Sequence, residues 1–339
     1  MKDHLITNVV YGQPYLDIFT NFHLRSFLDP SNLPAVKDRT HYHIFADEET
    51  APLIGAHENW KRLKENTKTC EMSIFSWDTD ENRFMQRYGV LIKMFKESVA
   101  KALKLNANLS AIVADLVCAK DFLPKIQKKM DEGHGAVFML PPRGAWESMC
   151  SNLAKTEGAL EAKELFSLTY QCLHPLWVAC QWDGLNFSKI PFSLLWNSGS
   201  GLLARSFSIT PIIFTPTVHM LNARQVIDVE IPAHCENPYW CENWTDAPVV
   251  GSEPVVCYYP PFAHERSSVE KVGNWAQKTL HPSQFGHLSK SLYYPDKETF
   301  HNTFSKDGLK IISQEAADLA GESGVVAQRI EQEYGGFLV

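Results

Sequence analysis

The chain has 339 residues, of which 45% are hydrophobic and 12% aromatic, so it can form one large folded domain or two smaller ones. Its formal net charge of -7 argues against general binding to nucleic acid or to an anionic membrane, because either partner requires a basic surface. We expect a cytoplasmic protein with no membrane span, because no stretch approaches the ~20 apolar residues of a spanning helix and the first residues lack a signal-peptide pattern.

The first half of the chain alternates between strand-like and helix-like segments. Strands are expected at HLITNVVY, HYHIFADE, TCEMSIFSW, a fourth segment that ends near Asp115, and GAVFMLPPR. Amphipathic helices separate these strands, and the longest is ENRFMQRYGVLIKMFKESVAKALKL. This order predicts an α/β fold with a mostly parallel central sheet covered by helices on both faces.

Ligands of open parallel sheets bind beyond the carboxyl ends of the strands. These ends are expected at residues 11–13, 46–49, 77–80, Asp115 and 141–143. The sequence therefore predicts a ligand crevice along this edge of the sheet.

The second half is less regular. It contains an aromatic-rich region and short strands in SGSGLLARSFSITPIIFTP, VIDVEIP and PVVCYYPP, and from about residue 262 it is helical. No Pro/Gly/Ser linker separates the two halves. We therefore predict one continuous domain over residues 1–261 and a helical C-terminal extension over residues 262–339.

Common sequence motifs of catalysis and cofactor binding are missing. The segment SGSGLLA is not a G-x-G-x-x-G dinucleotide loop, no G-x-S-x-G is present, and no cluster of histidines has metal-ligand spacing. Individual acidic residues are therefore the main candidates.

Asp115 follows the apolar run SAIVA, and a carboxylate at the end of a core strand faces the ligand crevice. A helix cap or a solvated loop residue explains it equally well. Asp47, in FADEE, poses the same choice, and capping of the next helix is a strong competitor. The lone His174, in CLHPLW, is more typical of a cap or a core residue than of a reactive group.

Asp228 and Glu230 lie two residues apart in VIDVEI, so on a strand they share one face opposite apolar neighbours. An ordinary half-buried strand is favoured on the pattern alone. Arg205 is in the middle of another predicted strand, where an unpaired charge is costly, so we expect it to pair with a diphosphate or with Asp228.

The opening segments NVVYGQPYLDIFTNFHLRSFLDPSNLPA and HYHIFADEE resemble the start of the GT-A-type glycosyltransferases. ANLSAIVADLVCAKDFLPKI is similar to the segment that carries the metal-binding acidic motif of that fold. SGSGLLARSFSITPIIFTP followed by VIDVEIP is similar to its acceptor side. Together with LHPL, GLLARSF and NWAQKTLHPSQFGHLSKSLYYP, these segments resemble a poorly characterised bacterial group of glycosyltransferase-like proteins, over about residues 5–295.

The resemblance implies a nucleotide-binding half over residues 1–143 and an acceptor half over residues 144–261. It also implies a nucleotide-sugar donor, an unidentified acceptor and a carboxylate base. We expect Glu230, or else Asp228, to act as the base, because two close carboxylates raise one pKa toward neutrality. The residues expected to hold the donor are Tyr11, Gly12, Asp47, Asp115 and Arg205.

A divalent metal, Mg²⁺ or Mn²⁺, is expected at Asp115 if one is used. The D-x-D of metal-dependent members is incomplete here, because Val117 stands where the second carboxylate belongs. A single carboxylate with substrate phosphates can still hold Mg²⁺, and Lys120 or Arg143 can neutralise a diphosphate without metal. The alternative function is a non-catalytic nucleotide-binding or interaction protein that keeps the fold. A nucleotidyltransferase ranks lower, because VVYGQPYLD lacks a Gly-rich loop with a lysine.

Overall fold

The computed structural model describes the chain except residues 78–82, 199–200, 225–230, 256–264, 296–313 and 336–339. Its centre is a seven-stranded sheet with the order β11-β6-β10-β4-β1-β2-β3. The bounds of these strands are β1 Asp3–Val10, β2 Thr40–Asp47, β3 Thr69–Phe75, β4 Ala107–Ala111, β6 Ala136–Met139, β10 Thr210–Phe214 and β11 Pro238–Trp240. Strand β10 runs antiparallel to both of its neighbours, and the other pairings in this sheet are parallel.

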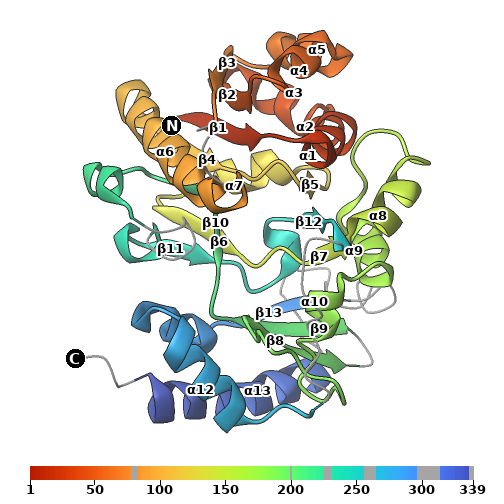
Figure 1. The fold of residues 1–339 in the computed structure, drawn as a ribbon, viewed down its shortest axis with the longest axis vertical. Helices are drawn as coiled ribbons and strands as arrows, with labels where there is room; N and C mark the ends of the chain where they lie inside the picture. Colours follow the sequence, from red (N-terminus) through yellow and green to blue (C-terminus); the bar gives the residue numbers. More distant parts are fainter. Residues whose placement is uncertain (78–82, 199–200, 225–230, 256–264, 296–313, 336–339) are drawn as a thin grey trace.

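Strands β1 and β2 form the buried middle of this sheet. Every residue of β2 is buried, as are most residues of β1, which is typical of strands covered on both faces. Neighbouring residues of β1 show the two layers, because Leu5 packs in the cluster of Phe95 and Val99 from one helix while Ile6 packs in the cluster of Ile126 from another. The predicted mostly parallel sheet covered by helices is therefore confirmed (Figure 1).

The helices of the first half connect the parallel strands. They are α1 Gln13–Ile18, a π-helix η1 Phe19–His23, α2 Leu24–Phe27, α3 Leu33–Val36, η2 Lys37–Arg39, α4 Ala51–Ala56, α5 Glu58–Glu65, α6 Arg83–Leu105 and α7 Phe122–Asp131. Helices α6 and α7 cover opposite faces of the sheet, since Phe95 belongs to α6 and Ile126 to α7.

A small second sheet, β5-β12-β7, lies beside the central one. Its strands are β5 Leu116–Cys118, β7 Arg143–Ala145 and β12 Val249–Glu253, and β12 is antiparallel to β5 but parallel to β7. Helices α8 Trp146–Leu153, α9 Ala162–Gln171 and α10 Pro175–Val178 follow β7 in the chain. Helix α9 begins with a reciprocal capping pair of Glu161 and Glu164.

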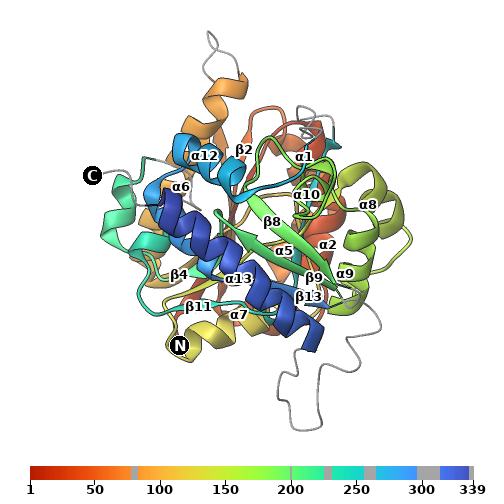
Figure 2. The ribbon, with the colours of Figure 1, turned by 90° about the horizontal axis from the view of Figure 1, so that it is seen from below.

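A third sheet, β13-β9-β8, carries the C-terminal helices. Its strands are β8 Ser193–Ser198, β9 Gly201–Ser206 and β13 Leu292–Pro295. Helices α12 Val269–Thr279 and α13 Gln314–Tyr334 pack on this sheet at the end of the molecule away from β3 (Figures 1 and 2). Short 3-10 helices complete the described part: η3 Val218–Asn222, η4 Ile231–His234, η5 Trp244–Asp246 and η7 Pro282–Ser289.

The helical character of the C-terminal part is confirmed, although β13 also belongs to it. Because β13 pairs with β9, residues on both sides of position 261 share one sheet and one core. The domain boundary at that position stays a prediction. In the described part of the chain no helix is long and apolar enough to cross a membrane.

Candidate functional site

Asp115 lies at the carboxyl edge of the central sheet, in the turn that joins β4 to β5. The predicted strand was too long, since β4 already ends at Ala111 and Asp115 falls between two strands. The backbone carbonyl of Asp115 accepts a 2.9 Å hydrogen bond from the Ser252 amide of β12. The second sheet therefore helps to hold the turn.

The carboxyl group of Asp115 is buried without full compensation. Asp115 is 6% exposed, and its Oδ1 has no hydrogen-bond partner in the described part of the chain. Burial raises the pKa of Asp115 to about 6, Arg143 opposes that rise, and the charge of Glu253 adds to it. An acid that titrates this close to neutrality in an edge crevice is a functional-site candidate.

Arg143 and Glu253 form an ion pair beside Asp115. Arg143 Nη1 lies 2.6 Å from Glu253 Oε1, and the glutamate side chain is 7% exposed while that of the arginine is 40% exposed. The parallel pairing of β7 with β12 sets this contact, because Gly251 faces Arg143 in the register. A Cβ at Gly251 would lie 3.3 Å from Arg143 Cγ, so glycine lets the arginine side chain pass close to β12.

A small cavity of about 80 Å³ opens next to Asp115. Arg143, Trp177, Ser208 and Thr210 contribute to its wall. The indole Nε1 of Trp177 is buried and, within the described residues, has no hydrogen-bond partner. The cavity thus has an unmatched acceptor on one lining residue and an unmatched donor on another, which suits a small polar group such as a hydroxyl.

Tyr11, Gly12 and Asp47 lie at the ends of β1 and β2, at the same edge of the sheet. Each carboxylate oxygen of Asp47 has a donor, because Oδ1 accepts from the Thr50 amide at 2.9 Å and Oδ2 from Trp77 Nε1 at 3.1 Å. These contacts are those of a turn residue. The competing interpretation was a cap of the next helix, but the N-cap position of α4 is held by Thr50. The ring of Tyr11 meets that of Trp77 edge-on at 5.1 Å. Gly12 precedes α1 with φ +73°, a conformation that favours glycine.

Arg205 does not lie in the predicted crevice, so this expectation is corrected. Its guanidinium is buried against the C-terminal helices, where Nε donates to Ser323 Oγ at 2.9 Å and Nη2 to the Ala320 carbonyl at 3.0 Å. Nη1 donates to the carbonyls of Leu288 and Ser289 at 2.8 and 3.0 Å. The charge is therefore satisfied inside the protein, where it ties β9 to α13.

Two other candidates have structural roles in the described part. His174 caps α10, because its Nδ1 accepts from the Leu176 amide at 3.2 Å. Lys120 pairs with Glu161 at the surface, at 2.8 Å.

Asp228 and Glu230 lie outside the described residues. Two described residues near them, Ala223 and Ile231, pack in the cluster that contains Phe95 and Val99 of α6. Ile231 itself begins the 3-10 helix η4, so the expected strand does not extend to it.

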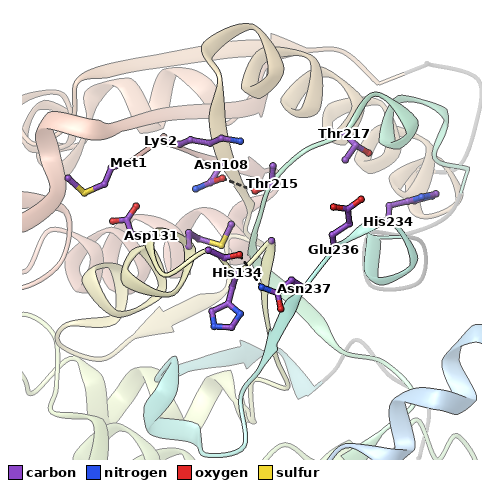
Figure 3. A pocket seen from close by; sticks show the side chains of 13 residues that line it. Met1, Lys2, Asn108, Asp131, His134, Thr215, Thr217, His234, Glu236 and Asn237 are labelled. Atoms are coloured by element: carbon purple, nitrogen blue, oxygen red, sulfur yellow. Dashed lines mark hydrogen bonds between the residues drawn. The ribbon is translucent and has the colours of Figure 1, made fainter.

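A cavity of about 490 Å³, larger than the one beside Asp115, lies at the opposite, amino edge of the sheet. Met1 and Asp131 stand on one side of it, and Thr217, His234 and Glu236 on the other (Figure 3). We place the candidate site at Asp115 instead, because in parallel sheets the carboxyl edge is the binding edge. Buried polar atoms without a partner among the described residues occur at both edges: Asp115 Oδ1 and Trp177 Nε1 at this one, and His134 Nδ1 and Thr217 Oγ1 at the amino-edge cavity.

The residues around Asp115 do not fit a metal centre. One carboxylate oxygen lacks a partner, but the neighbouring carboxylate of Glu253 is paired with Arg143, whose positive charge would repel a dication. No group of three or more potential ligands for a metal ion occurs among the described residues. We therefore derive no step through a metal.

Sequence reasoning missed Trp177 and Glu253. Glu253 had a recognisable signal, since it ends the strand-like segment VVGSE directly before a proline. Trp177 had none, because an aromatic residue in an aromatic-rich region predicts core packing.

No protein-family model and no curated protein matches the chain. One similar solved structure is a putative glucose-1-phosphate thymidylyltransferase from Bacillus anthracis in complex with a sucrose, with 11% identity, a TM-score of 0.25 and coverage of 43% of this chain and 57% of that one. Another is the apo form of mouse xyloside xylosyltransferase 1, with 13% identity, a TM-score of 0.24 and coverage of 46% and 58%. The chain spans less than two thirds of either structure. Both are transferases in name, but scores this low carry no argument about the site.

Proposed function

We propose that this protein is a nucleotide-sugar-dependent glycosyltransferase whose donor binds along the carboxyl edge of the central sheet. The observation that carries the proposal is the buried carboxyl group of Asp115, with Oδ1 unpartnered among the described residues and a pKa of about 6. Burying such a group costs free energy, so it is retained where a ligand supplies the missing hydrogen bond.

Each charged group has a distinct role in this proposal. At neutral pH Asp115 is largely ionised and accepts a hydrogen bond from a hydroxyl group of the nucleotide sugar. Arg143, whose side chain is 40% exposed, faces the same cavity and offsets negative charge on the departing nucleotide diphosphate. The acceptor hydroxyl loses its proton to a carboxylate, for which Glu230 and then Asp228 remain the sequence-based candidates.

Tyr11, Gly12 and Trp77 extend the same edge toward β3 and offer a surface for the nucleotide base. Tyr11 and Trp77 are both partly exposed, and Gly12 has no atom within 4 Å of the position where a Cβ would lie. An aromatic pair beside an open glycine provides a stacking surface with room for a planar ring.

Thermal unfolding with UDP-, GDP-, CMP- and dTDP-sugars, with and without Mg²⁺ or Mn²⁺, tests donor binding. A ligand that binds the folded state raises the melting temperature. We expect at least one nucleotide sugar to raise the melting temperature of the wild-type protein but not that of Asp115→Asn. Asp131→Asn is the matched control, because Asp131 lines the larger cavity at the amino edge.

The opposite pattern, in which Asp131→Asn abolishes stabilisation and Asp115→Asn preserves it, would place binding at the amino edge and refute the proposal. Binding without sugar transfer or donor hydrolysis would instead support the non-catalytic alternative. Where transfer is measured, Glu230→Gln or Asp228→Asn should lower turnover by about 10²–10⁴-fold while donor affinity is kept.

A further inference from the structure

Three buried polar side chains from separate elements join into one hydrogen-bonded chain beneath the Asp115 turn. They are Asn8 of β1, Tyr42 of β2 and His23 of the π-helix η1, and each residue is 0% exposed. Polar groups buried this deeply are costly unless they are bonded, so their contacts define what they do.

The two ends of this chain hold the two ends of the turn. Asn8 Nδ2 donates to the carbonyl of Ile112 at 2.8 Å, and His23 Nδ1 lies 2.7 Å from the carbonyl of Leu116. Tyr42 links them, since its hydroxyl donates to Asn8 Oδ1 and lies 3.0 Å from His23 Nε2. Ile112 and Leu116 flank the turn that carries Asp115, so one side-chain network spans both of its ends.

The His23 ring is held in a fixed orientation. It stacks between the rings of Phe19 and Phe27, with distances between ring centroids of 5.1 and 4.2 Å, and this fixes the plane in which its two nitrogens lie. The residue ends a five-residue π-helix, an irregularity that is frequent at functional sites. Burial also keeps the imidazole neutral, with its pKa lowered to about 3.

Residues that follow His23 in the chain hold β5, the strand that comes after the Asp115 turn. Ser26 Oγ accepts from the Cys118 amide at 3.2 Å, and Asn32 Nδ2 donates to the Ala119 carbonyl at 3.0 Å. Side chains from η1 through α3 therefore hold β5 on one side, while β12 pairs with it on the other. The position of Asp115 is thus set by residues that are distant from it in sequence.

We propose that Asn8, Tyr42 and His23 are positioning residues, which hold the turn of residues 112–116 so that the Asp115 carboxyl group stays buried against its cavity. This inference deepens the proposed function, on which its ligand-binding consequence rests. A buried hydrogen-bonded network that holds both ends of a turn restricts its geometry, which is what a preorganised binding group requires.

The test compares Tyr42→Phe with Tyr294→Phe. Both tyrosines are fully buried, and the hydroxyl of Tyr294 also donates to a single buried acceptor, the Leu140 carbonyl at 2.6 Å. Leu140 lines the same cavity as Asp115, so the control removes a similar hydrogen bond near the site but outside the network of Asn8, Tyr42 and His23. The first measurement is the pKa of Asp115 by NMR of ¹³C-labelled aspartate, assigned with Asp115→Asn. The second is amide hydrogen exchange over residues 112–118.

We expect Tyr42→Phe to release the turn. The pKa of Asp115 should then fall from about 6 toward 3.8 as water reaches the carboxyl group, and exchange over residues 112–118 should quicken by about 10-fold, the effect of one lost hydrogen bond. Tyr294→Phe should lower the melting temperature but leave both quantities at wild-type values. Asn8→Leu, which cuts the other end of the network, should reproduce the Tyr42→Phe result.

Unchanged pKa and exchange in Tyr42→Phe, or equal changes in Tyr294→Phe, would overturn the inference, because the network would then contribute only to general stability. Neither measurement needs a ligand. If no nucleotide sugar binds the wild-type protein, the proposed function fails while the positioning role is still decided.

Discussion

Replacing Asp115 with asparagine should stabilise the folded protein, relative to the wild type, more at neutral pH than at acidic pH. The folded-state pKa of Asp115 is raised by burial from 3.8 to about 6, so the folded protein holds this proton more tightly than the unfolded chain does. Ionisation of Asp115 therefore lowers stability. The penalty is absent well below pH 3.8, grows as the pH rises toward about 6, and is fully present above that.

The size of the effect follows from the shift. A change of about two pKa units corresponds to about 3 kcal/mol in the free energy of unfolding. Roughly 1 kcal/mol of this is already present at about pH 4.5, so about 2 kcal/mol should appear between about pH 4.5 and 7.5. Conversion to an energy is justified because Asp115 is only 6% exposed.

The assay is urea unfolding of the wild-type protein and of Asp115→Asn at both pH values. Subtracting the two proteins at each pH cancels the other titrating groups, and subtracting across pH cancels the constant effect of burying an amide. The reasoning is refuted if the difference between the proteins is the same at both pH values, or if it favours the wild type as the pH rises. Either result would mean that the carboxylate is solvated or fully bonded.

Two further changes test the surroundings of the site. Glu253→Gln removes the negative charge that raises the pKa of Asp115, so NMR titration should find that pKa below about 6, and a rise would contradict the assignment. Arg205→Leu should lower the free energy of unfolding by about 3 kcal/mol, because buried carbonyls and Ser323 lose their donor, while stabilisation by a nucleotide sugar persists. Loss of donor binding with unchanged stability in urea unfolding would restore Arg205 as a ligand-binding residue.

The central sheet was predictable because its signals are local. Strands β1 and β2 are short segments rich in β-branched and aromatic residues and are followed by amphipathic helices, and that alternation alone indicates parallel pairing. The antiparallel β10 was not predicted, because nothing in its own residues 210–214 specifies the direction of the strands it joins. Strand direction is decided by the length and path of the connections.

The candidate site was predictable only in part, because its electrostatics depend on distant residues. The end of a core strand correctly indicated Asp115 as a residue of the carboxyl edge. Its pKa depends on Glu253 and Arg143, which other strands bring beside it. Arg205 shows the same limit, since its partner Ser323 is 118 positions further along the chain and the sequence gives no sign of that contact.

Asp47 and Asp115 show why the partners of a carboxylate, rather than its position, separate structure from function. Both are buried aspartates at the carboxyl edge of one sheet. Asp47 has a donor for each oxygen, the Thr50 amide and the Trp77 indole, so the cost of its burial is offset within the protein. Asp115 has an oxygen without a donor in the described part of the chain, beside a cavity, and its raised pKa records the cost. A fold that gives each oxygen of the first carboxylate a donor, and leaves one oxygen of the second without any, has room at Asp115 for a hydrogen-bond donor from outside the chain.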